Sequence, residues 1–199
     1  MLQFLLMIAM CRTKLGKYDL AQLSFRRALE GFLGKGRIWW FGTSQPNWLA
    51  DAYVLAWLPQ RYVDTFTAIE SYKEDPRLPA PVAMYAYSLM RLIAEEDAAA
   101  AKYADSLLKQ PKLKDLFAAG QAIQAIIALD QPAFDDALGA LLQAHRGMAK
   151  FGALRETPEG YLCLPAMAPA KVALDRGMAV KSESEYLSQG YLDYLRHQG

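Results

Sequence analysis

Apolar residues recur along most of the chain at intervals of three and four residues, which is the pattern of an α-helix with one buried face. The first clear stripe contains Ala21, Phe25 and Phe32. Similar stripes follow in residues 48–56, 82–93, 113–127 and 134–142. No segment alternates apolar and polar residues between turn signals, as a half-buried strand would. The pattern therefore predicts an all-α fold.

Glycine and proline residues separate these stripes into helices joined by short connections, which favours antiparallel neighbours. Asp97 is expected as one helix N-cap, and either Asp130 or Gln131 precedes Pro132 at the start of a later helix. Two stretches, 34–46 and 148–161, lack the helical pattern and are expected to be irregular. We expect residues 1–199 to form a single helical domain.

The opening sequence MLQFLLMIAMC is apolar, but a membrane-spanning helix needs about 20 apolar residues. A secretory signal would place positive charge before the apolar run, whereas here Arg12 and Lys14 follow it. We interpret the segment as an internal helix, and we expect the natural protein to contain further helices before it. These features predict a soluble, cytoplasmic protein that does not enter a membrane.

Residues 15–32, LGKYDLAQLSFRRALEGF, resemble the second half of a tetratricopeptide repeat (TPR). Its glycine, tyrosine, alanine and aromatic positions match that repeat, and the small residues let two helices approach closely. Residues 97–108 and 130–142 repeat the pattern faintly, without a strict period. The sequence thus predicts stacked antiparallel helix hairpins that are TPR-like in part.

The composition and charge of the chain argue against several classes of function. The chain is 53% hydrophobic and 22% charged, with a formal net charge of +1. This balance argues against a nucleic-acid binder, which needs a concentrated basic surface. The two cysteines, Cys11 and Cys163, lie in apolar runs without metal-ligand spacing and are expected to be buried free thiols. No sequence motif for a metal or cofactor is present.

Candidate catalytic groups are few. His145 shares its helix face with Leu141 and Leu142, so we expect it to pack inside and to tie its helix to the region preceding Tyr161. A catalytic pair of His145 with Cys163 is the alternative. The acidic clusters 95–97 and 135–136 are interpreted as charged first turns of helices. We therefore predict that the protein is not an enzyme and uses no cofactor.

All four tryptophans lie between Trp39 and Trp57. Trp39, Trp40 and Phe41 are consecutive, so a regular element cannot bury all three. They form either an internal plug or an interface with a partner. The candidate partner-binding residues are Arg37, Trp39 and Trp40 in the first irregular stretch, with Arg155 and Tyr161 in the second.

The C-terminal half, roughly residues 80–195, is similar to the immunity-protein-49 family of bacterial polymorphic-toxin systems. Its members combine an acidic-x-x-Phe-x-x-Ala-Leu helix carrying His-Arg, a Leu-Pro-led helix and a Ser-x-Tyr-Leu closing motif. The matching positions are Phe134, Ala137, Leu138, His145, Arg146, Leu164, Pro165, Ala168, Ala173, Gly177, Ser184, Tyr186 and Leu187. Pro169, which is expected to interrupt the small-residue helix, and Ser188 depart from that pattern. A related family of nuclease-toxin immunity proteins, with a similar tyrosine-rich tail, matches almost as well.

The resemblance implies a protein that binds a cognate toxin domain and neutralises it in a tight protein–protein complex, without a cofactor. The competing hypothesis is a TPR-like helical adaptor that holds a peptide or a regulatory protein in a groove. An enzyme using His145 is a third hypothesis. A homo-oligomer is possible under each of them.

Overall fold

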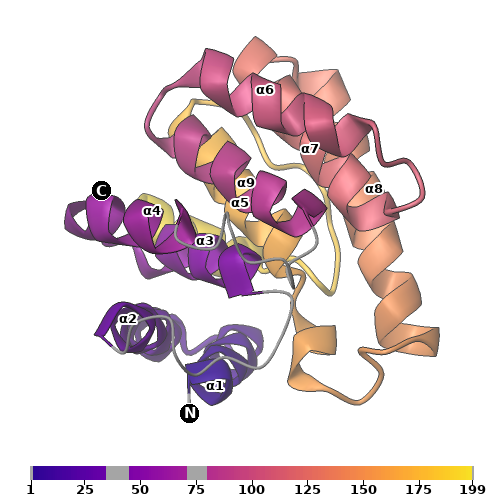
Figure 1. Ribbon diagram of the computed structural model, residues 1–199. Helices are drawn as coiled ribbons and strands as arrows, with labels where there is room; N and C mark the ends of the chain where they lie inside the picture. Colours follow the sequence, from indigo (N-terminus) through magenta and orange to yellow (C-terminus); the bar gives the residue numbers. More distant parts are fainter. Residues whose placement is uncertain (1, 35–44, 71–79, 199) are drawn as a thin grey trace.

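A computed structural model describes residues 2–34, 45–70 and 80–198. This part of the chain contains α-helices and two short 3-10 turns but no strand, which confirms the predicted all-α class (Figure 1). The elements are α1 (Leu2–Lys14), α2 (Tyr18–Gly34), α3 (Gln45–Ala56), η2 (Pro59–Arg61), α4 (Tyr62–Glu70), α5 (Ala80–Ile93), α6 (Asp97–Leu108), α7 (Lys114–Ala128), α8 (Gln131–Phe151), η3 (Pro158–Tyr161), α9 (Leu164–Asp175) and α10 (Gln189–Arg196). No helix in these residues is long and apolar enough to cross a bilayer.

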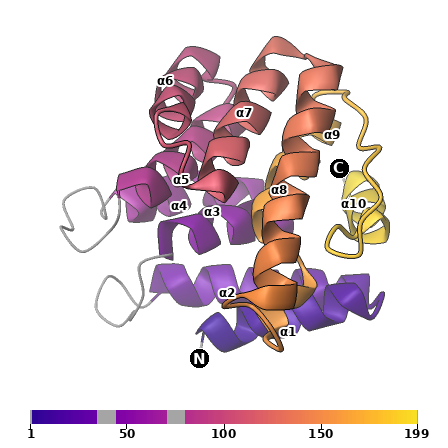
Figure 2. The ribbon, with the colours of Figure 1, turned by 90° about the vertical axis from the view of Figure 1, so that its right-hand side faces the viewer.

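Neighbouring helices along the chain pack on each other: α1 on α2, and then α5, α6, α7 and α8 in succession (Figure 2). The apolar stripes form the contacts, because Ala21, Phe25 and Leu29 of α2 are all fully buried. α9 departs from this succession. It returns to the middle of the molecule and contacts α3, α5, α7 and α8, while α10 packs on α9 and α2. The TPR-like character of the packing stays a prediction.

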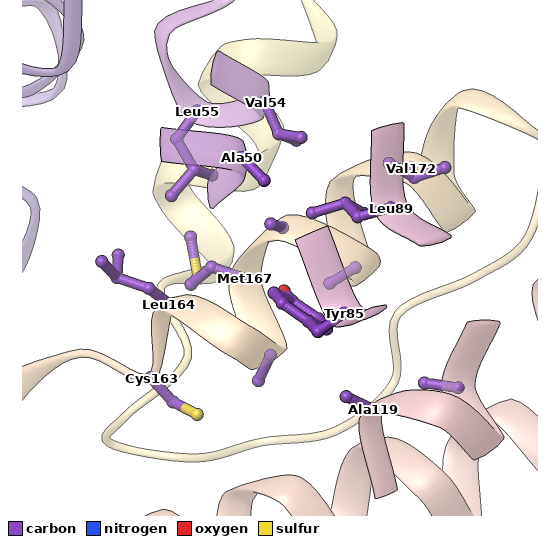
Figure 3. Close-up of a cluster of buried hydrophobic side chains, with 14 of the residues drawn as sticks. Ala50, Val54, Leu55, Tyr85, Leu89, Ala119, Cys163, Leu164, Met167 and Val172 are labelled. Atoms are coloured by element: carbon purple, nitrogen blue, oxygen red, sulfur yellow. The ribbon is translucent and has the colours of Figure 1, made fainter. Parts of the chain in front are cut away.

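α9 is central because its sequence is apolar or small on every side. Nine of its residues are buried, from Leu164 through Ala173. Figure 3 shows Met167 and Val172 of this helix near Ala50 of α3 and Leu89 of α5. A helix without a polar face is stable in water only when other elements surround it.

Three expectations about helix boundaries need correction. Pro169 lies inside α9 without ending it, since the only backbone bond it removes would reach Pro165 in the first turn. Asp97 is the first residue of α6 and not its N-cap, which is Glu96. α8 continues to Phe151, four residues into the predicted irregular stretch, because no helix-breaking residue occurs between the start of that stretch and Gly152. Of the two residues expected before Pro132, Asp130 is the N-cap of α8 and Gln131 is the first residue of the helix. The Asp130 carboxylate accepts a 3.0 Å hydrogen bond from the Ala133 amide.

Side chains from distant parts of the chain satisfy the last carbonyls of two helices. At the end of α3, Tyr191 donates to the Leu55 carbonyl at 2.7 Å, and Arg26 donates to the Ala56 carbonyl at 3.0 Å. At the end of α5, Arg176 donates to the Leu92 carbonyl at 2.7 Å. Helix ends leave such carbonyls without partners in their own helix. These bonds therefore fix the positions of α2, α9 and α10 relative to α3 and α5.

Candidate interaction surface

The segment between α8 and α9, residues 152–163, forms a compact turn that we call the α8–α9 connection. Its backbone folds on itself: the Leu154 amide donates to the Met148 carbonyl at 3.1 Å, and the Gly160 amide donates to the Thr157 carbonyl at 3.0 Å. A Cβ atom at Gly160 would collide with the Leu154 carbonyl, so this close approach requires glycine. The 3-10 turn η3 also packs on α1. The connection is thus held by its own hydrogen bonds and by a neighbouring helix.

His145 supports the connection from inside the molecule. Its side chain is buried and meets the Tyr186 ring edge to face, with 5.0 Å between the ring centroids. It also forms a hydrogen bond with the Gly160 backbone. Burial lowers the imidazole pKa, and the bond to Gly160 opposes this only in part. The prediction that His145 is a core residue tying α8 to the region preceding Tyr161 is confirmed.

The outer side of the connection carries large side chains that face solvent. Phe151, the last residue of α8 just before the connection, is 88% exposed, and Tyr161, near the end of the connection, is 47% exposed. The Arg155 side chain is 68% exposed, and it forms an ion pair with the adjacent Glu156 at 3.4 Å. Arg155 and Tyr161 thus both lie exposed in the α8–α9 connection, and Phe151 is exposed next to it. These three residues form what we call the outer platform. A role of Arg155 and Tyr161 in partner binding stays a prediction.

The other predicted partner-binding residues, Arg37, Trp39 and Trp40, lie outside the described residues. Of the two remaining tryptophans, Trp48 packs against the core from α3 and is partly buried, as expected. Trp57 follows α3 with a φ of 52°, in the left-handed region. The Lys171 ammonium sits over its ring, 3.7 Å from the centroid. Both of these tryptophans therefore have partners within the chain.

A cleft of about 590 Å³ lies where α3, α5, α9 and α10 end. Its wall is formed mainly by apolar side chains, including those of Trp57, Ile93 and Leu195. The buried Lys171 ammonium binds Asp175, and Arg176 binds Asp97 at 2.7 Å. Because these two cations already have carboxylate partners, they have little charge left to attract an anionic ligand.

The core contains a buried carboxyl group that accepts a hydrogen bond from a tyrosine, and this feature was not predicted from the sequence. Asp51 of α3 is fully buried, and its Oδ1 accepts a 2.7 Å hydrogen bond from the Tyr85 hydroxyl, while Oδ2 has no hydrogen-bond partner. Burial raises the Asp51 pKa to about 7, although the bond from Tyr85 opposes the shift. The sequence does indicate that Asp51 is buried, since it stands between alanines in a helix that is apolar on most sides.

The described residues provide neither an activated cysteine nucleophile nor a cluster of metal ligands. Burial raises the pKa of the Cys163 thiol to about 12, so the thiol stays protonated at neutral pH and is a poor nucleophile. The alternative pairing of Cys163 with His145 therefore lacks an activated thiol. In the described part of the chain, no three His, Cys, Asp or Glu side chains gather in a way that could hold a metal ion.

A family model matches more than half of the chain. The family model described as Immunity protein 49 matches residues 62–188, and this chain belongs to that family. The match runs from α4 through the segment that precedes α10. No curated protein and no solved structure matches the chain.

Two of the positions that carry the resemblance, His145 and Tyr186, are in direct contact. His145 of α8 contacts Tyr186, and the Tyr186 carbonyl accepts a 2.9 Å hydrogen bond from the Cys163 amide just before α9. The amide of Ser188, one of the two departures, lies 3.3 Å from the Met167 sulfur of α9. The closing motif thus packs against both α8 and α9. These positions act mainly as the scaffold behind the outer platform.

Proposed function

We propose that this protein is a cytoplasmic immunity protein that binds and neutralises a cognate bacterial toxin in a tight protein–protein complex. Membership of the Immunity protein 49 family is the observation that carries the proposal. Neutralisation needs tight binding, since a few free toxin molecules suffice to damage a cell. Nanomolar affinity corresponds to about −12 kcal/mol.

We place part of the toxin contact on the outer platform. Its Phe151, Arg155 and Tyr161 belong to residue classes that contribute strongly to interfaces, where a few aromatic or arginine side chains supply most of the binding energy. The hydrogen-bonded turn behind them supports the choice, because a contact surface that is already ordered loses less entropy on binding. Arg37, Trp39 and Trp40 remain proposed contacts on the sequence argument alone.

The test is co-expression of this gene with the toxin domain encoded beside it, followed by survival counts and pull-down. The expected result is protected cells and a stable complex. Phe151→Ala and Tyr161→Ala should each weaken the complex about tenfold or more. Val63→Ala is the matched control, because Val63 lies in α4 and is 70% exposed.

Two results of this test would contradict parts of the proposal. If cells die equally fast with and without the protein, and no complex is recovered, the immunity proposal is wrong. The adaptor hypothesis would then take its place, and screening of peptides for binding would be its test. If the complex forms but neither platform variant weakens it, the toxin binds elsewhere on the surface.

A further inference from the structure

A shallow groove runs along the outer side of α7 and α8. It consists of two adjoining hollows of about 530 Å³ and 510 Å³, which share Gln121 as a lining residue. Lys114 and Gly147 line one end, and Ala128 and Ala133 line the other, so the two helices run antiparallel along the groove. Figure 2 shows α7 and α8 side by side over their lengths. The groove follows about 15 residues of each helix, or roughly 20 Å.

The floor of the groove is made largely of alanine and glycine. Its small lining residues are Ala118, Ala125, Ala128, Ala133, Ala137, Ala140, Ala144 and Gly147. Between two helices, such a floor leaves room for the ridge of a third helix to pack closely. On α8 the same stripe continues one turn beyond Gly147 to Phe151. The groove therefore leads directly onto the outer platform.

The two ends of the groove carry opposite charges. Lys114 lines one end, with Lys112 exposed just before it, while Asp130 and Asp136 line the other end. Within the described chain, Lys112, Lys114 and Asp136 take part in no ion pair and no side-chain hydrogen bond. The ends are separated by more than the screening length of about 8 Å at physiological salt, so each attracts its own counter-charge.

We propose that this groove receives an α-helix of the toxin. Acidic side chains of that helix would lie over Lys112 and Lys114, and basic side chains would lie over Asp130 and Asp136. The proposal rests on the proposed immunity function and names the element of the toxin that is recognised. A convex helix fits between α7 and α8, whereas the same groove of a second copy is concave and fits poorly.

Two glycines of α8 provide a matched test. Neither Gly147 nor Gly139 has any atom within 4 Å of the position that a Cβ would take. Gly147 lines the groove, but Gly139 does not. Gly147→Met and Gly139→Met should therefore both fold, and both should gain slightly in helix propensity. Gly147→Met should weaken toxin binding about tenfold or more, while Gly139→Met should bind as the wild type does.

A second variant tests the charges at the ends of the groove. The double substitution Lys112→Glu with Lys114→Glu should slow association with the toxin domain, and the effect should shrink as salt concentration rises. Substituting glutamate or aspartate by lysine at the facing end of the toxin helix should restore the rate. Surface plasmon resonance with the toxin domain encoded beside the gene measures both effects.

The outcomes separate this inference from the proposed function. If the wild type does not bind or protect, the proposed function fails first and the groove proposal fails with it. If the wild type binds but Gly147→Met binds equally well, only the groove proposal is wrong. If Gly147→Met instead abolishes self-association in light scattering, the groove holds a second copy, and the proposed helix of the toxin is excluded.

Discussion

The buried carboxyl group of Asp51 makes the stability of the protein depend on pH in a direction that can be measured. Within the described ranges 2–34, 45–70 and 80–198, its one side-chain hydrogen bond comes from the Tyr85 hydroxyl, and no cation contributes to its pKa. The neighbouring Tyr85 and Cys163 have raised pKa values and stay neutral at pH 7. In this part of the core, Asp51 is therefore the group that titrates near neutrality.

The size of this pH dependence follows from the change in the Asp51 pKa on folding. The Asp51 pKa rises from 3.8 to about 7 on folding. Between these values the folded state holds a proton that the unfolded state has lost, so stability falls as pH rises. The contribution is fully present below 3.8 and is lost as pH rises through about 7. Each pKa unit corresponds to about 1.4 kcal/mol, so a pKa difference of about 3 changes the free energy of unfolding by roughly 4 kcal/mol.

Asp51→Asn isolates this contribution, because an amide is neutral at every pH and can still accept the Tyr85 hydrogen bond. The free energy of unfolding of the wild type, relative to this variant, should decrease by roughly 4 kcal/mol between pH 4 and pH 8. Urea unfolding at four pH values measures it. Asp193→Asn is the control, since Asp193 is exposed. Parallel pH curves for wild type and Asp51→Asn would refute the reasoning.

Three further substitutions test the supports described above. His145→Ala should lower the free energy of unfolding by about 1–3 kcal/mol at pH 7.5 in urea. The stability of the wild type relative to this variant should fall on acidification, because the folded pKa of His145 lies below its usual value. Gly160→Ala should lower the melting temperature, because the added Cβ meets the Leu154 carbonyl, and an unchanged melting temperature would contradict the described turn. Tyr191→Phe should cost about 1–2 kcal/mol by leaving the Leu55 carbonyl without its donor, which calorimetry can check.

Much of the fold could be predicted from sequence because it depends on local patterns. Periodic apolar residues, with glycine and proline between them, define helices such as α2 and α7 without knowledge of their neighbours. The position of α9 could not be predicted in this way. Its many small apolar residues indicate burial, but they do not say which helices surround it. The bonds from Tyr191 to Leu55 and from Arg176 to Leu92 join residues far apart in the chain.

The candidate surface was predicted in part for a similar reason. Arg155 and Tyr161 follow from the polar, proline-containing stretch that had to be a surface connection. Phe151 was missed because a phenylalanine near the end of an apolar helix is normally expected to be buried. Its exposure depends on where α8 stops relative to the core. Asp97 was assigned as a cap from its position before an alanine-rich helix, whereas its carboxylate instead binds Arg176 across the fold.

The arrangement separates the scaffold from the side chains that are free to contact a partner. His145 and Tyr186 face inward and hold the connection, and Gly160 lets its backbone close on itself. Phe151 and Tyr161 face outward and contribute little to that packing. Outward residues can therefore be exchanged at small cost in stability, while exchange of inward residues displaces the whole connection. Under the proposed function, this division would let specificity for a partner change without loss of the fold.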